Sequence, residues 1–191
     1  MKVEILPYNP QWKNKFEEEK KLLSELLKEF NTVIEHIGST AIEGLGAKPV
    51  VDIQIGMRKY EDLDLMVDKM IAAGYVYYKK YEEVLPDRRY FVKAANPNND
   101  ILPKVLYTYE DNFDRKEHPH LFHIHTVELD SDWWRRHIAF RDYLRSNDDA
   151  RDEYYKLKVD LSRKEWEDKN DYTDAKTEFV KSIERLAGIH E

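Results

Sequence analysis

Residues 36–55 read HIGSTAIEGLGAKPVVDIQI, and this stretch decides the fold that we predict for the chain. The short β-branched run at 32–37 predicts a strand that ends at Gly38 and Ser39. A turn or short helix follows, and the nearly continuous apolar run at 50–55 then predicts a central strand. We therefore expect a strand, a glycine turn and a second, neighbouring strand.

The polar residues of this unit indicate phosphate chemistry. Gly38 lets a ligand approach the backbone closely, and the amides of the turn, with the hydroxyl groups of Ser39 and Thr40, are suited to hold an anion. Asp52 and Gln54 lie two positions apart on the second strand and therefore share one face. A carboxylate beside a phosphate-binding turn is what Mg²⁺-assisted phosphoryl or nucleotidyl transfer requires. We therefore predict that Asp52 is the catalytic, Mg²⁺-binding acid.

Amphipathic helices and short strands flank this unit. Asn9 and Pro10 mark the start of a helix of about 20 residues, whose apolar stripe should dock on the sheet while the charged run 17–21 faces outward. Periodicity and turn residues predict a helix near 63–70 that stops at Gly74, strands at 75–81, 88–93 and 121–128, a turn at 96–100, and three helices from Ser131 to the C-terminal end. This order predicts an α+β fold, a small mixed β-sheet with helices packed on it.

The composition of the 191 residues limits the possible function classes. The chain is 41% hydrophobic and 36% charged, which is too apolar for a disordered chain and too charged for a membrane protein. There is no cysteine and no apolar signal core at the N-terminus, so we expect a cytoplasmic protein without disulfides. The net charge of −7 argues against a nucleic-acid partner. A small phosphorylated ligand needs only a local cluster of donors.

The 36–55 stretch resembles the signature of the GrpB family, whose members are assigned to the nucleotidyltransferase superfamily. The resemblance covers most of the chain: residues 3–12 read VEILPYNPQW, 123–125 read HIH, and 138–148 read IAFRDYLRSND. It implies a sheet of nucleotidyltransferase type within a single GrpB-like domain over residues 1–191, of which 131–191 form the helical C-terminal part. Relatives of this module also occur fused to dephospho-coenzyme A kinase, which points to nucleotide or coenzyme metabolism.

One position departs from the superfamily pattern. The glycine-serine turn and Asp52 match that pattern, but Gln54 stands where the superfamily carries a second acid. Its amide oxygen can ligate a metal but brings no negative charge. His123 and His125 share one face of a predicted strand, and with Asp52 they could form a two-histidine, one-carboxylate site suited to Mn²⁺ or another transition metal. The alternative is that both histidines are hydrogen-bonded polar residues of the sheet.

Three basic residues are candidates for neutralising phosphate charge. Lys48 lies just before the strand that carries Asp52. Arg88 and Arg89 open a predicted strand, on which only one of the two can face a given side. The alternative for Lys48 is a solvated surface lysine. His36, just before the turn, is expected to be a half-buried histidine with a hydrogen-bond partner.

Three functions remain open at this point. The first is an enzyme that transfers a nucleotidyl or phosphoryl group from a nucleoside triphosphate to a small acceptor, with Asp52 and Mg²⁺. The second is a non-catalytic nucleotide- or coenzyme-binding module that has lost the second acid. The third is a metal-dependent phosphohydrolase built on His123 and His125. In each case the partner is a small nucleotide or phosphorylated molecule, and the sequence does not define an oligomeric state.

Overall fold

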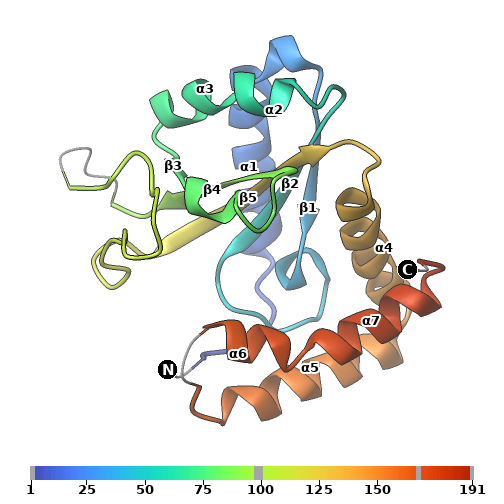
Figure 1. Ribbon diagram of the computed structural model, residues 1–191. Helices are drawn as coiled ribbons and strands as arrows, with labels where there is room; N and C mark the ends of the chain where they lie inside the picture. The colour runs from blue at the N-terminus through green and yellow to red at the C-terminus, as the bar shows by residue number, and fades with distance from the viewer. Residues whose placement is uncertain (1–2, 97–100, 167–168, 190–191) are drawn as a thin grey trace.

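A five-stranded mixed sheet forms the centre of the computed structural model, which describes residues 3–96, 101–166 and 169–189 (Figure 1). The strands lie in the order β1-β2-β5-β4-β3, with β2 and β5 parallel and the other neighbours antiparallel. Their bounds are Val33–Ile37 for β1, Val51–Met57 for β2, Val76–Tyr77 for β3, Arg88–Ala94 for β4 and His120–Glu128 for β5. The α+β class and the mixed sheet are therefore confirmed. The turn predicted at 96–100 lies mostly outside the described residues.

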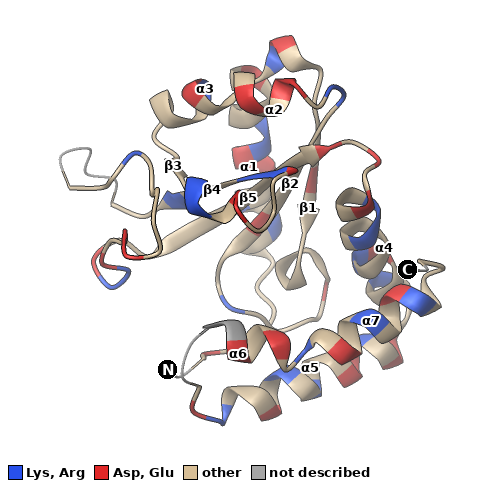
Figure 2. Cartoon of the chain, in the orientation of Figure 1, with Lys and Arg blue, Asp and Glu red and all other residues tan. Residues whose placement is uncertain are grey.

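The helices divide between the two faces and one end of the sheet. Their bounds are Gln11–Leu26 for α1, Asp62–Leu65 for α2, Val67–Ala72 for α3, Asp132–Ser146 for α4, Asp148–Ser162 for α5, Lys169–Asp174 for α6 and Thr177–Leu186 for α7. Three short 3₁₀ turns join them: η1 (Lys28–Phe30), η2 (Ser39–Ala41) and η3 (Lys79–Tyr81). Helices α5, α6 and α7 pack together beyond the β1–β2 end of the sheet (Figure 1). Along the helices, acidic and basic residues are interspersed (Figure 2).

One face of the sheet is apolar and carries the main core. Alternate residues of β2, among them Ile53 and Ile55, point to this face and are fully buried against α1, α2 and α3. The opposite face carries Asp52 and Gln54, with α4 covering part of it. Because successive strand residues alternate between faces, a single apolar run yields both the core and the polar surface on which a site can form.

Glu19 corrects one expectation for α1. The side chains of the charged run 17–21 are predicted to face solvent, but the Glu19 side chain is buried, with only 3% of the residue exposed. Its spacing explains this, because it follows Trp12 by seven residues and Phe16 by three and so lies on the apolar stripe. The carboxylate accepts hydrogen bonds from the Tyr75 hydroxyl and from Lys93 Nζ, at 2.6 Å in the second case. A buried carboxylate with two donors therefore fastens α1 to the sheet.

Three predicted elements are shorter than expected. The strand predicted at 75–81 spans only Val76–Tyr77, because the backbone leaves the extended conformation at Tyr78 and turns into η3. The helix near 63–70 is divided at Met66 into α2 and α3, and the last helix is divided into α6 and α7. Within the described residues, no helix is long and apolar enough to cross a membrane.

Candidate functional site

The glycine turn and the acid of the next strand are in direct contact. In the antiparallel pair of β1 and β2, Ile37 lies opposite Asp52, so the turn that follows β1 begins beside the carboxylate. Gly38 has φ 69° and ψ −173°, a conformation that is essentially restricted to glycine. A Cβ atom at this position would lie 2.5 Å from Asp52 Oδ2. Glycine is therefore required both by the backbone and by the side chain packed against it.

Asp52 begins a chain of polar side chains that runs across the sheet. The parallel register of β2 and β5 places His123 beside Asp52, with Nδ1 of the histidine 3.3 Å from Oδ1 of the carboxylate. His123 Nε2 is 2.9 Å from His120 Nδ1, and His120 Nε2 is 3.3 Å from the Tyr78 hydroxyl. One proton arrangement satisfies every contact: Tyr78 donates to His120, His120 to His123, and His123 to Asp52. Burial lowers the pKa of His120 to about 3, so this ring is neutral as the arrangement requires.

Gln54 and His125 lie farther along the same face, beneath α4. The fully buried Gln54 donates from Nε2 to the Trp134 carbonyl at 3.3 Å, and its Oε1 has no hydrogen-bond partner in the described part of the chain. His125 Nδ1 accepts from Arg88 at 3.2 Å, and burial lowers the pKa of this histidine well below its usual value. Among the described residues, no group of three or more His, Asp or Glu side chains is placed to hold a metal ion. The two-histidine, one-carboxylate arrangement considered above is therefore not formed, and Asp52 stands as a single carboxylate.

Three of the predicted phosphate-binding residues make contacts away from Asp52. Thr40 is buried, and its hydroxyl lies 2.9 Å from Nε2 of His36 on the outer side of the turn. Arg89 lies on the apolar face of the sheet, where Nε donates to Asp64 Oδ1 at 2.7 Å. Its neighbour Arg88 takes the polar face, as strand alternation requires, but contacts His125 rather than Asp52. The structure does not bring these three side chains to the carboxylate.

The C-terminal helices supply side chains that the sequence analysis did not assign to the site. Tyr154 of α5 is buried, which raises the pKa of its hydroxyl group, and it lies near enough to Ser39 and Asp52 for both to act on that pKa. The Tyr172 ring of α6 lies within 4.5 Å of Lys48 Nζ and within 4.4 Å of Lys176 Nζ, measured to the ring centroid. Lys48 and Lys176 are near enough to Asp52 for its charge to act on them.

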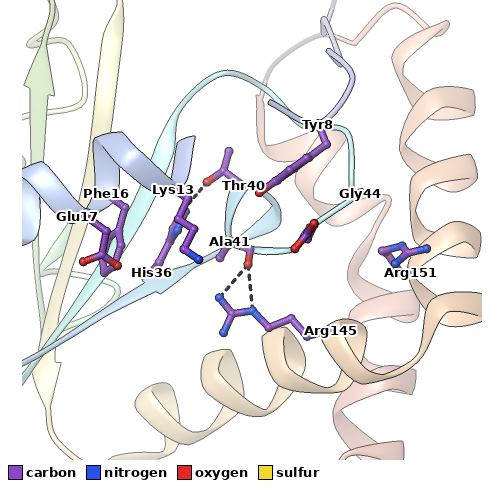
Figure 3. A pocket seen from close by; sticks show the side chains of 11 residues that line it. Tyr8, Lys13, Phe16, Glu17, His36, Thr40, Ala41, Gly44, Arg145 and Arg151 are labelled. Atoms are coloured by element: carbon purple, nitrogen blue, oxygen red, sulfur yellow. Dashed lines mark hydrogen bonds between the residues drawn. The ribbon is translucent and has the colours of Figure 1, made fainter. Parts of the chain in front are cut away.

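A hollow of about 720 Å³ lies on the outer side of η2 (Figure 3). Arg145 donates to the Ala41 carbonyl from two nitrogens, at 3.0 and 2.8 Å, and so ties the turn to α4. Arg151, which also lines the hollow, is paired with Asp148 and Asp152. Both arginines that line this hollow are thus bonded within the protein, and we assign to Arg145 the structural role of holding the turn.

The fold and the Gly38–Asp52 contact define the chain as an α+β protein with a nucleotidyltransferase-like fold. Residues 2–186 match the model of the GrpB protein family, and the chain belongs to this family. It is 32% identical to the glutamate-rich protein GrpB of Alkalihalophilus pseudofirmus, over 95% of this chain and 93% of that protein. It is 33% identical to protein YqkA of Bacillus subtilis, over 97% of this chain but only 47% of that protein. The crystal structure of the conserved protein GrpB from Enterococcus faecalis superposes with a TM-score of 0.74, at 31% identity and 96% coverage of both chains.

Proposed function

We propose that this protein binds a nucleoside triphosphate with Mg²⁺ at Asp52 and transfers a nucleotidyl or phosphoryl group to a small acceptor. The observation that carries the proposal is the packing of Asp52 against Gly38, which places the carboxylate directly beside the turn that carries the Ser39 hydroxyl. The Asp52 side chain is 30% exposed, so a ligand can reach it. The lysines beside it supply positive charge for phosphate oxygens.

A single carboxylate suits Mg²⁺ in a nucleotide complex. Mg²⁺ prefers oxygen ligands and is usually held by one or two carboxylates together with substrate phosphates and water. Asp52 would hold the ion, which when bound polarises the phosphoryl group that is attacked. His123 orients the carboxylate through its Nδ1–H, and the Ser39 hydroxyl binds a phosphate oxygen. Lys48 stabilises the negative charge that develops on the leaving phosphate.

A second function, nucleotide binding without turnover, is favoured by the position of Gln54. The superfamily's second acid would have to lie where this amide is buried beneath α4 and bonded to the Trp134 carbonyl. With one acid the site holds less negative charge for metal ions, which disfavours the two-metal mechanism. This alternative predicts ligand binding with no product formed, and tolerance of Asp52→Asn. Product analysis after incubation with a nucleoside triphosphate and Mg²⁺ separates the two functions.

Replacement of the acid provides the direct test. We expect Asp52→Ala to weaken the binding of Mg²⁺-nucleotide by about tenfold or more, because the ion loses its protein ligand. Isothermal titration of ATP, GTP and CTP with Mg²⁺ against the wild type and the variant measures this. Asp68→Ala, which changes an exposed acid on α3, is the matched control and should bind as the wild type does. Equal affinities for the wild type and Asp52→Ala would remove Asp52 from the mechanism.

A further inference from the structure

Three lysines from distant parts of the sequence gather at the segment that leads from the glycine turn to β2. Lys48 lies in the loop before β2, Lys158 on α5, and Lys176 between α6 and α7. Lys48 and Lys176 both contact the ring of Tyr172, at 4.5 and 4.4 Å from its centroid. Lys158 Nζ lies 4.8 Å from the centroid of Tyr154, the residue that interacts with Ser39. Lys48 and Lys176 thus share one aromatic ring, and Lys176 is near enough to Lys158 for its charge to act on that ammonium group.

Lys158 is the most deeply placed of the three. It is only 3% exposed, and its Nζ donates to the carbonyl of Gly46, in the segment that leads from the turn to β2. A buried ammonium group has three protons to donate and is normally compensated by an acid. The Lys158 ammonium group instead donates to a neutral carbonyl, that of Gly46. The charged residue that acts on it is another lysine, Lys176. This is an unusual arrangement for a residue that serves only to pack α5.

Positive charges outnumber negative charges in this lysine cluster. Burial, and then the charge of Lys176, lowers the pKa of Lys158 to about 7. Burial, and then the charge of Lys48, lowers the pKa of Lys176 to about 8, with Asp52 opposing the shift. Arg115, from the loop before β5, adds a further positive charge that acts on Lys48. Asp52 thus faces several cations, and an anion bound among them would relieve their mutual repulsion.

We propose that Lys48, Lys158 and Lys176 form an anion subsite that binds the terminal phosphates of a polyphosphate ligand. The inference rests on the proposed function in taking the ligand to be a nucleoside triphosphate, and it deepens that function by assigning a role to α5 and α7. Because Gln54 replaces the second acid of the superfamily pattern, the site holds a second metal ion less well. The lysines supply the positive charge on the phosphates that such an ion would otherwise supply. Tyr154, between Lys158 and Ser39, links this subsite to the glycine turn.

Metal-free binding of tripolyphosphate tests the subsite independently of Mg²⁺. The titration is carried out at pH 7 with EDTA, with ATP and AMP as further ligands. We expect Lys176→Met to weaken tripolyphosphate binding by about tenfold, and Lys176→Arg, which keeps the charge, to bind within about threefold of the wild type. Lys156→Met, which removes an exposed lysine from the same helix as Lys158, is the control and should have no effect. AMP, which has one phosphate, should bind more weakly than ATP and respond less to Lys176→Met.

Asp52→Asn separates the subsite from the metal site. Without metal, Asp52 repels an anion bound to the lysines, so this variant should bind tripolyphosphate at least as tightly as the wild type. If Lys176→Met binds tripolyphosphate as the wild type does, the subsite is refuted, whatever Asp52→Ala does to Mg²⁺-nucleotide binding. If Lys176→Met is weakened but Asp52→Ala binds Mg²⁺-nucleotide normally, the subsite stands and the role of Asp52 fails. Urea denaturation of each variant shows that a loss of binding is not a loss of folding.

Discussion

The Gly38→Ala variant is expected to lose about 3 kcal/mol of stability and to lose ligand binding at Asp52. The backbone of Gly38, with φ 69° and ψ −173°, is in a region that costs a non-glycine residue about 1–3 kcal/mol. The added methyl group would also lie 2.5 Å from Asp52 Oδ2 and 3.1 Å from its Cβ, so the carboxylate has to move. Urea denaturation measures the first effect, and titration with Mg²⁺-nucleotide measures the second.

Gly74→Ala is a matched control for this experiment. Gly74 also has a positive φ, of 90°, but a Cβ there would meet no heavy atom within 4 Å. Its replacement therefore carries backbone strain without a steric conflict, and about 1 kcal/mol is expected with no change in binding. If the two variants were equally destabilised and both bound nucleotide, the proposed packing of the turn against Asp52 would be wrong.

The contact between the glycine turn and Asp52 was predictable because both lie within one short stretch of sequence, residues 36–55. A strand, a glycine turn and a strand that returns beside the first leave few ways to arrange residues 36–55, and the pairing of Ile37 with Asp52 follows from that connection. Strand alternation likewise predicted that only one of Arg88 and Arg89 could face the polar side. It could not predict that Arg88 would be drawn to His125, because that contact depends on how the buried ring is oriented.

The long-range part of the site was not predictable from local patterns. The Lys158 ammonium group and the Gly46 carbonyl are 112 residues apart in the chain, and their contact arises only when α5 packs on the turn. Tyr154 packs in the apolar cluster of the C-terminal helices, and helical spacing alone gives no indication that it lies near Ser39. The strand predicted at 121–128 left His120 outside it. The structure begins β5 at His120, which brings the ring to His123.

His36 is expected to make the protein sensitive to acid. The ring is 5% exposed, stacks on Phe16 with 4.7 Å between centroids, and shares a hydrogen bond with Thr40. Burial lowers its pKa from 6.5 to about 4, with Arg145 and Arg141 acting in the same direction and Asp52 opposing them. As the pH falls from 6.5 to 4, the unfolded chain binds a proton at this histidine that the folded protein does not bind. Protonation therefore favours the unfolded state, and stability falls over this window.

The size of this effect follows from the pKa difference. Each pH unit within the window costs about 1.4 kcal/mol for one proton, so His36 alone should reduce the free energy of unfolding by about 3 kcal/mol between pH 6.5 and pH 4. Urea denaturation at several pH values measures the decline. His36→Phe keeps an aromatic ring against Phe16 but cannot titrate. It leaves the Thr40 hydroxyl without its partner at every pH, so the slopes with pH are compared rather than the absolute stabilities. A variant that declined as steeply as the wild type would show that His36 is protonated in the folded protein, and that the turn leading to Asp52 is more accessible to water than its packing on Phe16 implies.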